Sequence, residues 1–151
     1  MPGPDTEFTD PALVLSGAQY RTIVAHCYDG LPDEACGLLA GPVRADGEPT
    51  GAVTTVYPCT NADASARTYT VDSRDLIQAM RDAETRHEEL VGVWHSHTHS
   101  DAYPSDTDVR QAMEPHWLYV LISLKHAEPV LRSYRIRDGH VAECEVVVAD
   151  S

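Results

Sequence analysis

Apolar residues recur along the chain with two periods, which predict an alternation of strands and helices. Short apolar runs between turn residues, and stretches rich in β-branched or alternating residues, predict strands. The predicted strands are 13–15, the apolar half of 33–41, 52–57, 68–71, 90–95, 117–124, 130–137 and 140–148. Asp138-Gly139 is a hairpin turn between the last two.

Helical spacing of apolar residues predicts three helices. The first follows Ser16 as its N-cap, covers 17–28 and is broken by the turn 29–32. The second begins at 72 or 73 and runs to about Glu89, with charged residues opposite its apolar face. A shorter helix is expected over 105–114, after Pro104.

This order of elements predicts one α/β or α+β domain with a mixed sheet. A length of 151 residues suits a single hydrophobic core. The chain shows no internal repeat and no second-domain linker. We expect residues 1–11 to form a flexible acidic tail and residues 12–149 to form the domain.

The charge of the chain restricts its partners. The formal net charge is −13, and such a surface repels the phosphates of nucleic acids and anionic membranes. The first ten residues lack the basic and apolar regions of a signal peptide, and no stretch is apolar enough to span a membrane. We therefore expect a cytoplasmic protein without nucleic-acid or membrane partners. A homodimer is compatible with the sequence.

Four cysteines are widely spaced along the chain. Cys27, Cys36, Cys59 and Cys144 include no Cys-x-x-Cys pair, which disfavours a zinc knuckle or a thioredoxin-type site. In a cytosolic protein of this size we expect them to be reduced thiols.

Residues 92–108 concentrate the side chains that can bind a metal. His95, His97 and His99 alternate, and Ser105 and Asp108 follow. Because side chains of a strand repeat every two residues, His95 and His97 point to the same side, within reach of one ion. Zinc accepts imidazole and carboxylate ligands. Spacing leaves two candidates for the third ligand, His99 and Asp108.

The segment 105–108 also has a plain structural interpretation. Ser105 at the N-cap with an acid at Asp108 resembles a capping box, although Glu or Gln is usual at the second position. Both interpretations are compatible, since a helix start can also present a hydroxyl to an oxyanion.

The complete pattern resembles a known family. His95-x-His97, seven residues, Ser105, two residues and Asp108 are similar to the JAMM signature of MPN-domain metallopeptidases. The upstream segment 33–41 resembles the one that carries the catalytic glutamate of that family. The resemblance extends from about residue 16 to 148. It is strongest to the small bacterial Mec-type peptidases in the segments 32–37, 60–62, 95–98, 102–105 and 131–136.

The resemblance implies a role for each matching residue. His95, His97 and Asp108 would bind one zinc ion per chain. Glu34 would hold the water and act as general base, and Ser105 would help to stabilise the oxyanion. The strand that carries Glu34 must then lie beside the histidine loop. The site needs no ligand at the position of His99, which we expect to be exposed.

The resemblance also implies a fold and a substrate. The fold would be a curved mixed β-sheet flanked by two or three helices, similar to cytidine deaminase. Mec-type enzymes remove cysteine from the carboxyl terminus of the ubiquitin-like sulfur carrier CysO, so the expected partner is a sulfur carrier that ends in Gly-Gly. We expect its tail to lie along an edge near Tyr69 and Val71, with Asn61 or Arg67 beside it.

Three other functions are compatible with parts of this pattern. The protein could be an isopeptidase for other ubiquitin-like conjugates, or a metal-free MPN scaffold. RadC-type proteins share a similar histidine–serine–aspartate spacing, but the acidic charge argues against a nucleic-acid role.

Overall fold

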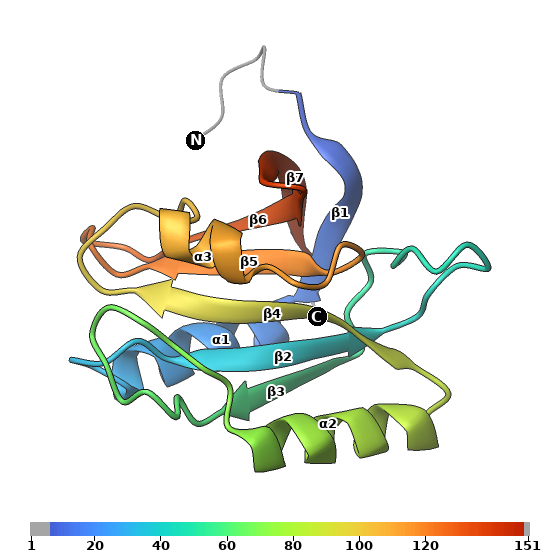
Figure 1. Cartoon of the computed structure of the whole chain (residues 1–151), viewed down its shortest axis with the longest axis horizontal. Coiled ribbons are helices and arrows are strands. Elements are labelled where there is room, and N and C mark those ends of the chain that lie inside the picture. The colour runs from blue at the N-terminus through green and yellow to red at the C-terminus, as the bar shows by residue number, and fades with distance from the viewer. Residues whose placement is uncertain (1–6, 150–151) are drawn as a thin grey trace.

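A computed structural model describes residues 7–149 of the chain. Seven strands form one sheet in the order β1-β7-β6-β5-β4-β2-β3, in which β1–β7 and β4–β5 are parallel and the other pairs antiparallel (Figure 1). The strands are β1 (Thr9–Ser16), β2 (Cys36–Gly41), β3 (Thr55–Cys59), β4 (Glu89–His97), β5 (Leu118–Ser123), β6 (Val130–Arg137) and β7 (His140–Ala149). The helices are α1 (Gly17–Asp29), α2 (Ser73–Thr85) and α3 (Asp106–Gln111).

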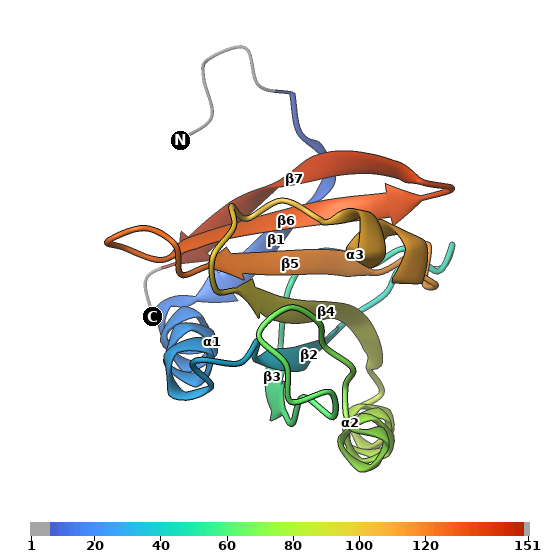
Figure 2. The same ribbon diagram turned by 60° about the vertical axis from the view of Figure 1, so that its left-hand side comes forward.

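Helices cover both faces of the sheet. Figure 2 shows α1 on one face and α2 and α3 on the other. Ile23 and Cys27 of α1 pack into the main core, whereas Ala79 of α2 packs beside Val93 on the opposite face. The mixed sheet and the flanking helices confirm the predicted fold class. None of the helices within residues 7–149 is long and apolar enough to cross a membrane.

The first helix begins where the sequence predicts. Ser16 Oγ accepts a hydrogen bond from Gln19 N at 3.0 Å, and Gln19 Oε1 accepts one from Ser16 N at 2.9 Å. This reciprocal capping box satisfies two backbone N–H groups at the helix start. The four cysteines are free and buried, as expected.

Two predictions around α2 were wrong. The helix ends at Thr85 rather than near Glu89, because His87 turns the chain at φ +58° and Glu89 already belongs to β4. Residues 68–71 form no strand. A single bridge joins Val71 to Asn61, and loop contacts hold the rest of this segment.

Other boundaries shift by a few residues. β3 covers Thr55–Cys59 instead of 52–57, because Ala52 bridges β1 at Val14. α3 ends at Gln111 instead of 114, where Ala112 is extended. The expected tail overlaps β1, which starts at Thr9, and residues 1–6 of that tail lie outside the described part.

Glu48, in the turn between β2 and β3, anchors that turn to β6. Its carboxylate accepts hydrogen bonds from Arg135 Nη2 at 2.5 Å and Arg137 Nη2 at 2.8 Å, and His116 Nδ1 lies 2.9 Å away. Burial alone would raise the pKa of Glu48, but hydrogen bonds from Arg135 and the other two partners lower it to about 2.

Candidate metal centre

Strand β4 places two histidines side by side. It lies between β2 and β5, and both His95 and His97 are buried, at 4% exposed. Their Nε2 atoms lie 3.3 Å apart. The predicted alternation along the strand is therefore confirmed, since both rings reach the same point on the face that carries α2 and α3.

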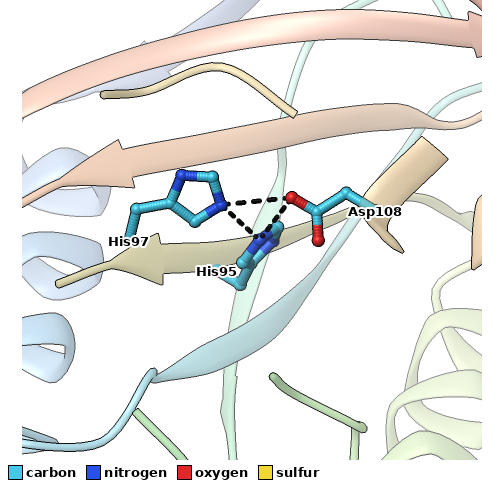
Figure 3. A group of neighbouring side chains, drawn as sticks. All are labelled: His95, His97 and Asp108. Atoms are coloured by element: carbon cyan, nitrogen blue, oxygen red, sulfur yellow. Dashed lines mark hydrogen bonds and ion pairs between the residues drawn. The ribbon is translucent and has the colours of Figure 1, made fainter. Parts of the chain in front are cut away.

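The start of α3 brings a carboxylate to the same point. Ser105 Oγ accepts from Asp108 N at 3.1 Å, and Asp108 Oδ2 accepts from Ser105 N at 2.9 Å, which completes the predicted capping box. The same Oδ2 lies 3.1 Å from Nε2 of His97 and 3.4 Å from Nε2 of His95 (Figure 3).

The spacing of these three atoms fits a zinc ion. With bonds of about 2.0–2.1 Å, two ligands of a tetrahedral zinc lie roughly 3.3 Å apart. The pairs formed by His95, His97 and Asp108 are separated by 3.3, 3.1 and 3.4 Å. His99 is exposed, and its Nδ1 lies 2.8 Å from Thr98 Oγ1. The geometry thus favours Asp108 over His99 as the third ligand.

Neighbouring groups orient both imidazoles. Nδ1 of His97 lies 2.8 Å from the backbone carbonyl of Asp101, so this nitrogen donates and leaves the Nε2 lone pair free. Tyr69 stacks on His95 with ring centres 4.1 Å apart. Burial lowers the pKa of His95, which favours the neutral imidazole that a metal requires.

Asp108 remains a carboxylate in this environment. Without a metal, burial would raise its pKa, but hydrogen bonds that the imidazoles of His95 and His97 donate when Nε2 is protonated outweigh burial and hold the pKa well below its usual range.

The candidate general base lies beside the histidines. Pairing of β2 with β4 sets Cys36 opposite His95, and Ser96 N donates to Ala35 O at 3.0 Å. Glu34, one residue earlier, is only 6% exposed, and burial raises its pKa to about 7. The expected proximity of the Glu34 segment to the histidine loop is confirmed.

A loop between β3 and α2 holds Glu34 in place. The backbone N of Glu34 donates to Ser65 O at 2.8 Å, and Asn61 Nδ2 donates to the backbone carbonyl of Glu34 at 2.9 Å. The Asn61 side chain also donates to Thr68 O and accepts from Thr70 N. Because these bonds occupy both ends of its amide, Asn61 supports the loop instead of facing a substrate.

Sequence reasoning missed three supporting contacts. These are the Tyr69 ring on His95, the Asp101 carbonyl on His97, and Ser96 Oγ, which accepts from Ala35 N at 2.9 Å. Ser96 stands between the two histidines and could have been suspected from that position. Nothing in the sequence marks a backbone carbonyl or a stacking partner 26 residues away.

Known proteins similar to this chain share its site-bearing region. The family model of prokaryotic homologs of the JAB domain matches residues 17–137. The CysO-cysteine peptidase of Mycobacterium tuberculosis is 42% identical over 139 residues, which cover 91% of this chain and 92% of that protein. The desampylase of Haloferax volcanii is 32% identical over 120 residues, which cover 76% and 83%.

Solved structures show the same fold. Protein DSY2949 from Desulfitobacterium hafniense superposes with a TM-score of 0.81 at 34% identity, over 92% of this chain and 94% of that one. AF2198, a JAB1/MPN domain protein from Archaeoglobus fulgidus, gives a TM-score of 0.56 at 18% identity, over 89% and 98%. Sequence and structure together establish that the chain belongs to the JAB/MPN domain family, in its prokaryotic branch.

Proposed function

We propose that the protein is a zinc-dependent peptidase that hydrolyses the amide bond after the carboxyl-terminal Gly-Gly of a ubiquitin-like sulfur carrier and releases cysteine or another amino acid. The observation that carries this proposal is the convergence of His95, His97 and Asp108 beside the buried Glu34. The 42% identity to a CysO-cysteine peptidase supports the substrate class. A place in cysteine biosynthesis is part of the proposal.

Each polar group of the site has a proposed role. His95, His97 and Asp108 would hold one zinc ion, which would supply a Lewis acid and lower the pKa of a water to near neutrality. Glu34 accepts the proton of the attacking water and transfers it to the leaving amine. A pKa near neutrality suits both transfers.

Ser105 is the proposed oxyanion donor. Its Oγ accepts from Asp108 N, so the hydroxyl hydrogen remains available for the developing negative charge on the scissile carbonyl oxygen. Loss of one such donor costs about 3 kcal/mol in other hydrolases.

The carrier tail is proposed to lie beside residues 65–71. This segment contacts Glu34 through Ser65 and the histidine strand through Thr98, whose Oγ1 donates to Ala66 O at 3.3 Å. The sequence placed the tail along a strand edge at Tyr69 and Val71, but residues 68–71 form no strand, so the tail would lie against a loop. Asn61 is excluded as a direct contact by its own hydrogen bonds.

A second candidate is an isopeptidase for other ubiquitin-like conjugates. It is favoured by the 32% identity to a desampylase. A metal-free scaffold accounts poorly for a buried group of two histidines and one aspartate, since such a group gains nothing from burial without a ligand.

Mass spectrometry of a CysO-type carrier extended by cysteine tests the proposal. The purified protein with about one zinc per chain is expected to release cysteine, and Glu34→Gln is expected to retain zinc but lose turnover. Glu84→Gln, an identical change on the exposed face of α2, is the matched control and should remain active. Cleavage of lysine-linked conjugates alone would support the isopeptidase, and full activity of Glu34→Gln would remove Glu34 from the mechanism.

A further inference from the structure

Two loops meet on the side of His97 away from the segment 65–71. One loop, 100–105, follows the histidine strand, and the other is the β5–β6 turn, 124–129. Leu124 N donates to the backbone carbonyl of His97 at 2.9 Å, and Ser123 Oγ donates to Ser100 O at 2.6 Å. Figure 1 shows both loops on the opposite side of the carboxyl end of β4 from the green loop that precedes α2.

Lys125, the only lysine among the 151 residues, lies at this junction. Its Nζ is 3.3 Å from Asp101 Oδ1, and Nε2 of His126 is 3.3 Å from the same oxygen. The Asp101 backbone carbonyl in turn accepts from His97. A lysine and an imidazole therefore share one carboxylate, next to a residue of the metal centre.

Lys125 uses only part of its hydrogen-bonding capacity on Asp101. An ammonium group has three N–H donors, and Asp101 takes one of those on Lys125. Arg132 is paired with Glu143 at 3.0 Å, and Arg110 donates to Thr107 at 3.1 Å.

We propose that Lys125, assisted by His126, binds the free α-carboxylate of the amino acid that the reaction releases. This inference rests on the proposed function, which places the carrier tail beside 65–71 and hence the leaving residue on the opposite side of His97. In a terminal residue the carboxylate carbon lies only about 2.5 Å from the scissile nitrogen. A carboxylate at that position would therefore lie close to the two loops beside the metal centre.

The His126 side of this junction borders open space. A hollow of about 510 Å³ opens beside it, lined by Asp101, Tyr103 and His126 among others. Recognition of a free carboxylate here would restrict the enzyme to the last residue of its substrate, since an internal amide carries no charge at that position.

The test compares two substrates that differ only in this charge. A CysO-type carrier is ligated to cysteine or to cysteine amide, and kcat/KM is measured for each. The wild-type protein is expected to prefer the free acid by about tenfold to hundredfold, the range of a charge-assisted hydrogen bond. Lys125→Gln should reduce this acid-to-amide ratio to near one, and Lys125→Arg should restore part of it.

Arg74→Gln, at the exposed start of α2, is the matched control, because it removes the same charge away from both the carrier tail and the leaving residue, and it should keep the wild-type ratio. Equal cleavage of acid and amide by the wild-type protein would overturn the inference and leave the proposed function standing. A Lys125→Gln variant that keeps the wild-type ratio would also overturn it. Failure to cleave either carrier would remove the proposed function, and this inference with it.

Discussion

Replacing Glu34 by Gln isolates the energetic consequence of burying a carboxyl group beside the metal centre. Burial raises the pKa of Glu34 from 4.5 to about 7 in the metal-free fold. A folded pKa above the unfolded value stabilises the protein below pH 4.5. That stabilisation is lost as pH rises through 7, because the folded state must then give up a proton that it holds more tightly. Glutamine has the same shape and no proton to lose.

The size of the effect follows from the two pKa values. Relative to a carboxyl group whose pKa is 4.5 in both states, the raised pKa of Glu34 lowers the free energy of unfolding by about 1 kcal/mol at pH 5 and about 3 kcal/mol at pH 8. Between these pH values, the free energy of unfolding of Glu34→Gln should therefore rise by about 2 kcal/mol relative to that of the wild-type protein. The contributions of titrating groups that do not interact with Glu34 cancel in the difference; His97, whose pKa Glu34 raises, is the exception.

Urea unfolding of the metal-free proteins at pH 5, 6, 7 and 8 measures this difference. The midpoint of Glu34→Gln should move upward relative to the wild type with each step in pH. A difference that stays constant from pH 5 to pH 8 would refute the raised pKa, and with it the reason for assigning Glu34 as a base that works near neutrality.

Three further substitutions test other parts of the structure. Asp108→Ala should lose zinc and His99→Ala should keep about one zinc per chain by metal analysis, and the opposite pattern would make His99 the third ligand. Asn61→Ala should retain zinc but lower kcat more than tenfold and the free energy of unfolding by about 2–3 kcal/mol. The reason is that the carbonyl of Glu34 and the loop around Asn61 lose their hydrogen-bond partner. Unchanged kcat would show that the loop does not position Glu34. Glu48→Gln should lower the free energy of unfolding by at most about 3 kcal/mol at pH 7. The pKa of Glu48, lowered to about 2, stabilises the fold above pH 4.5, and this stabilisation is lost as the pH falls toward 2. Equal sensitivity of both proteins to acid would contradict that ion pair.

The pattern of apolar residues predicts the parts of the fold that are locally determined. The helix after Ser16 and the strand ending at His95 and His97 follow from capping and periodicity, which depend on adjacent residues. The end of α2 could not be predicted, because a left-handed turn at His87 stops it within an otherwise helical pattern. The segment 68–71 alternates like a strand but belongs to a loop held by Asn61.

The candidate site, like the fold, could be predicted only in its locally determined part. Spacing alone places His95 and His97 together, but it could not choose between His99 and Asp108, because that choice depends on where the chain returns after the loop. The resemblance to a family made the choice, and the geometry agrees with it. Lys125 comes close to Asp101 because β4 pairs with β5 just before both residues, a contact that local sequence does not report.

Asp108 gives α3 an unusual dependence on the proposed metal. One carboxylate oxygen both caps the helix through Ser105 N and faces the two histidines. The helix has six residues and none of them is buried, so packing contributes little to its stability. Ion loading and local ordering are then linked for this segment: amide hydrogen exchange in α3 would report zinc occupancy, and chelation would loosen the helix while the sheet stays protected.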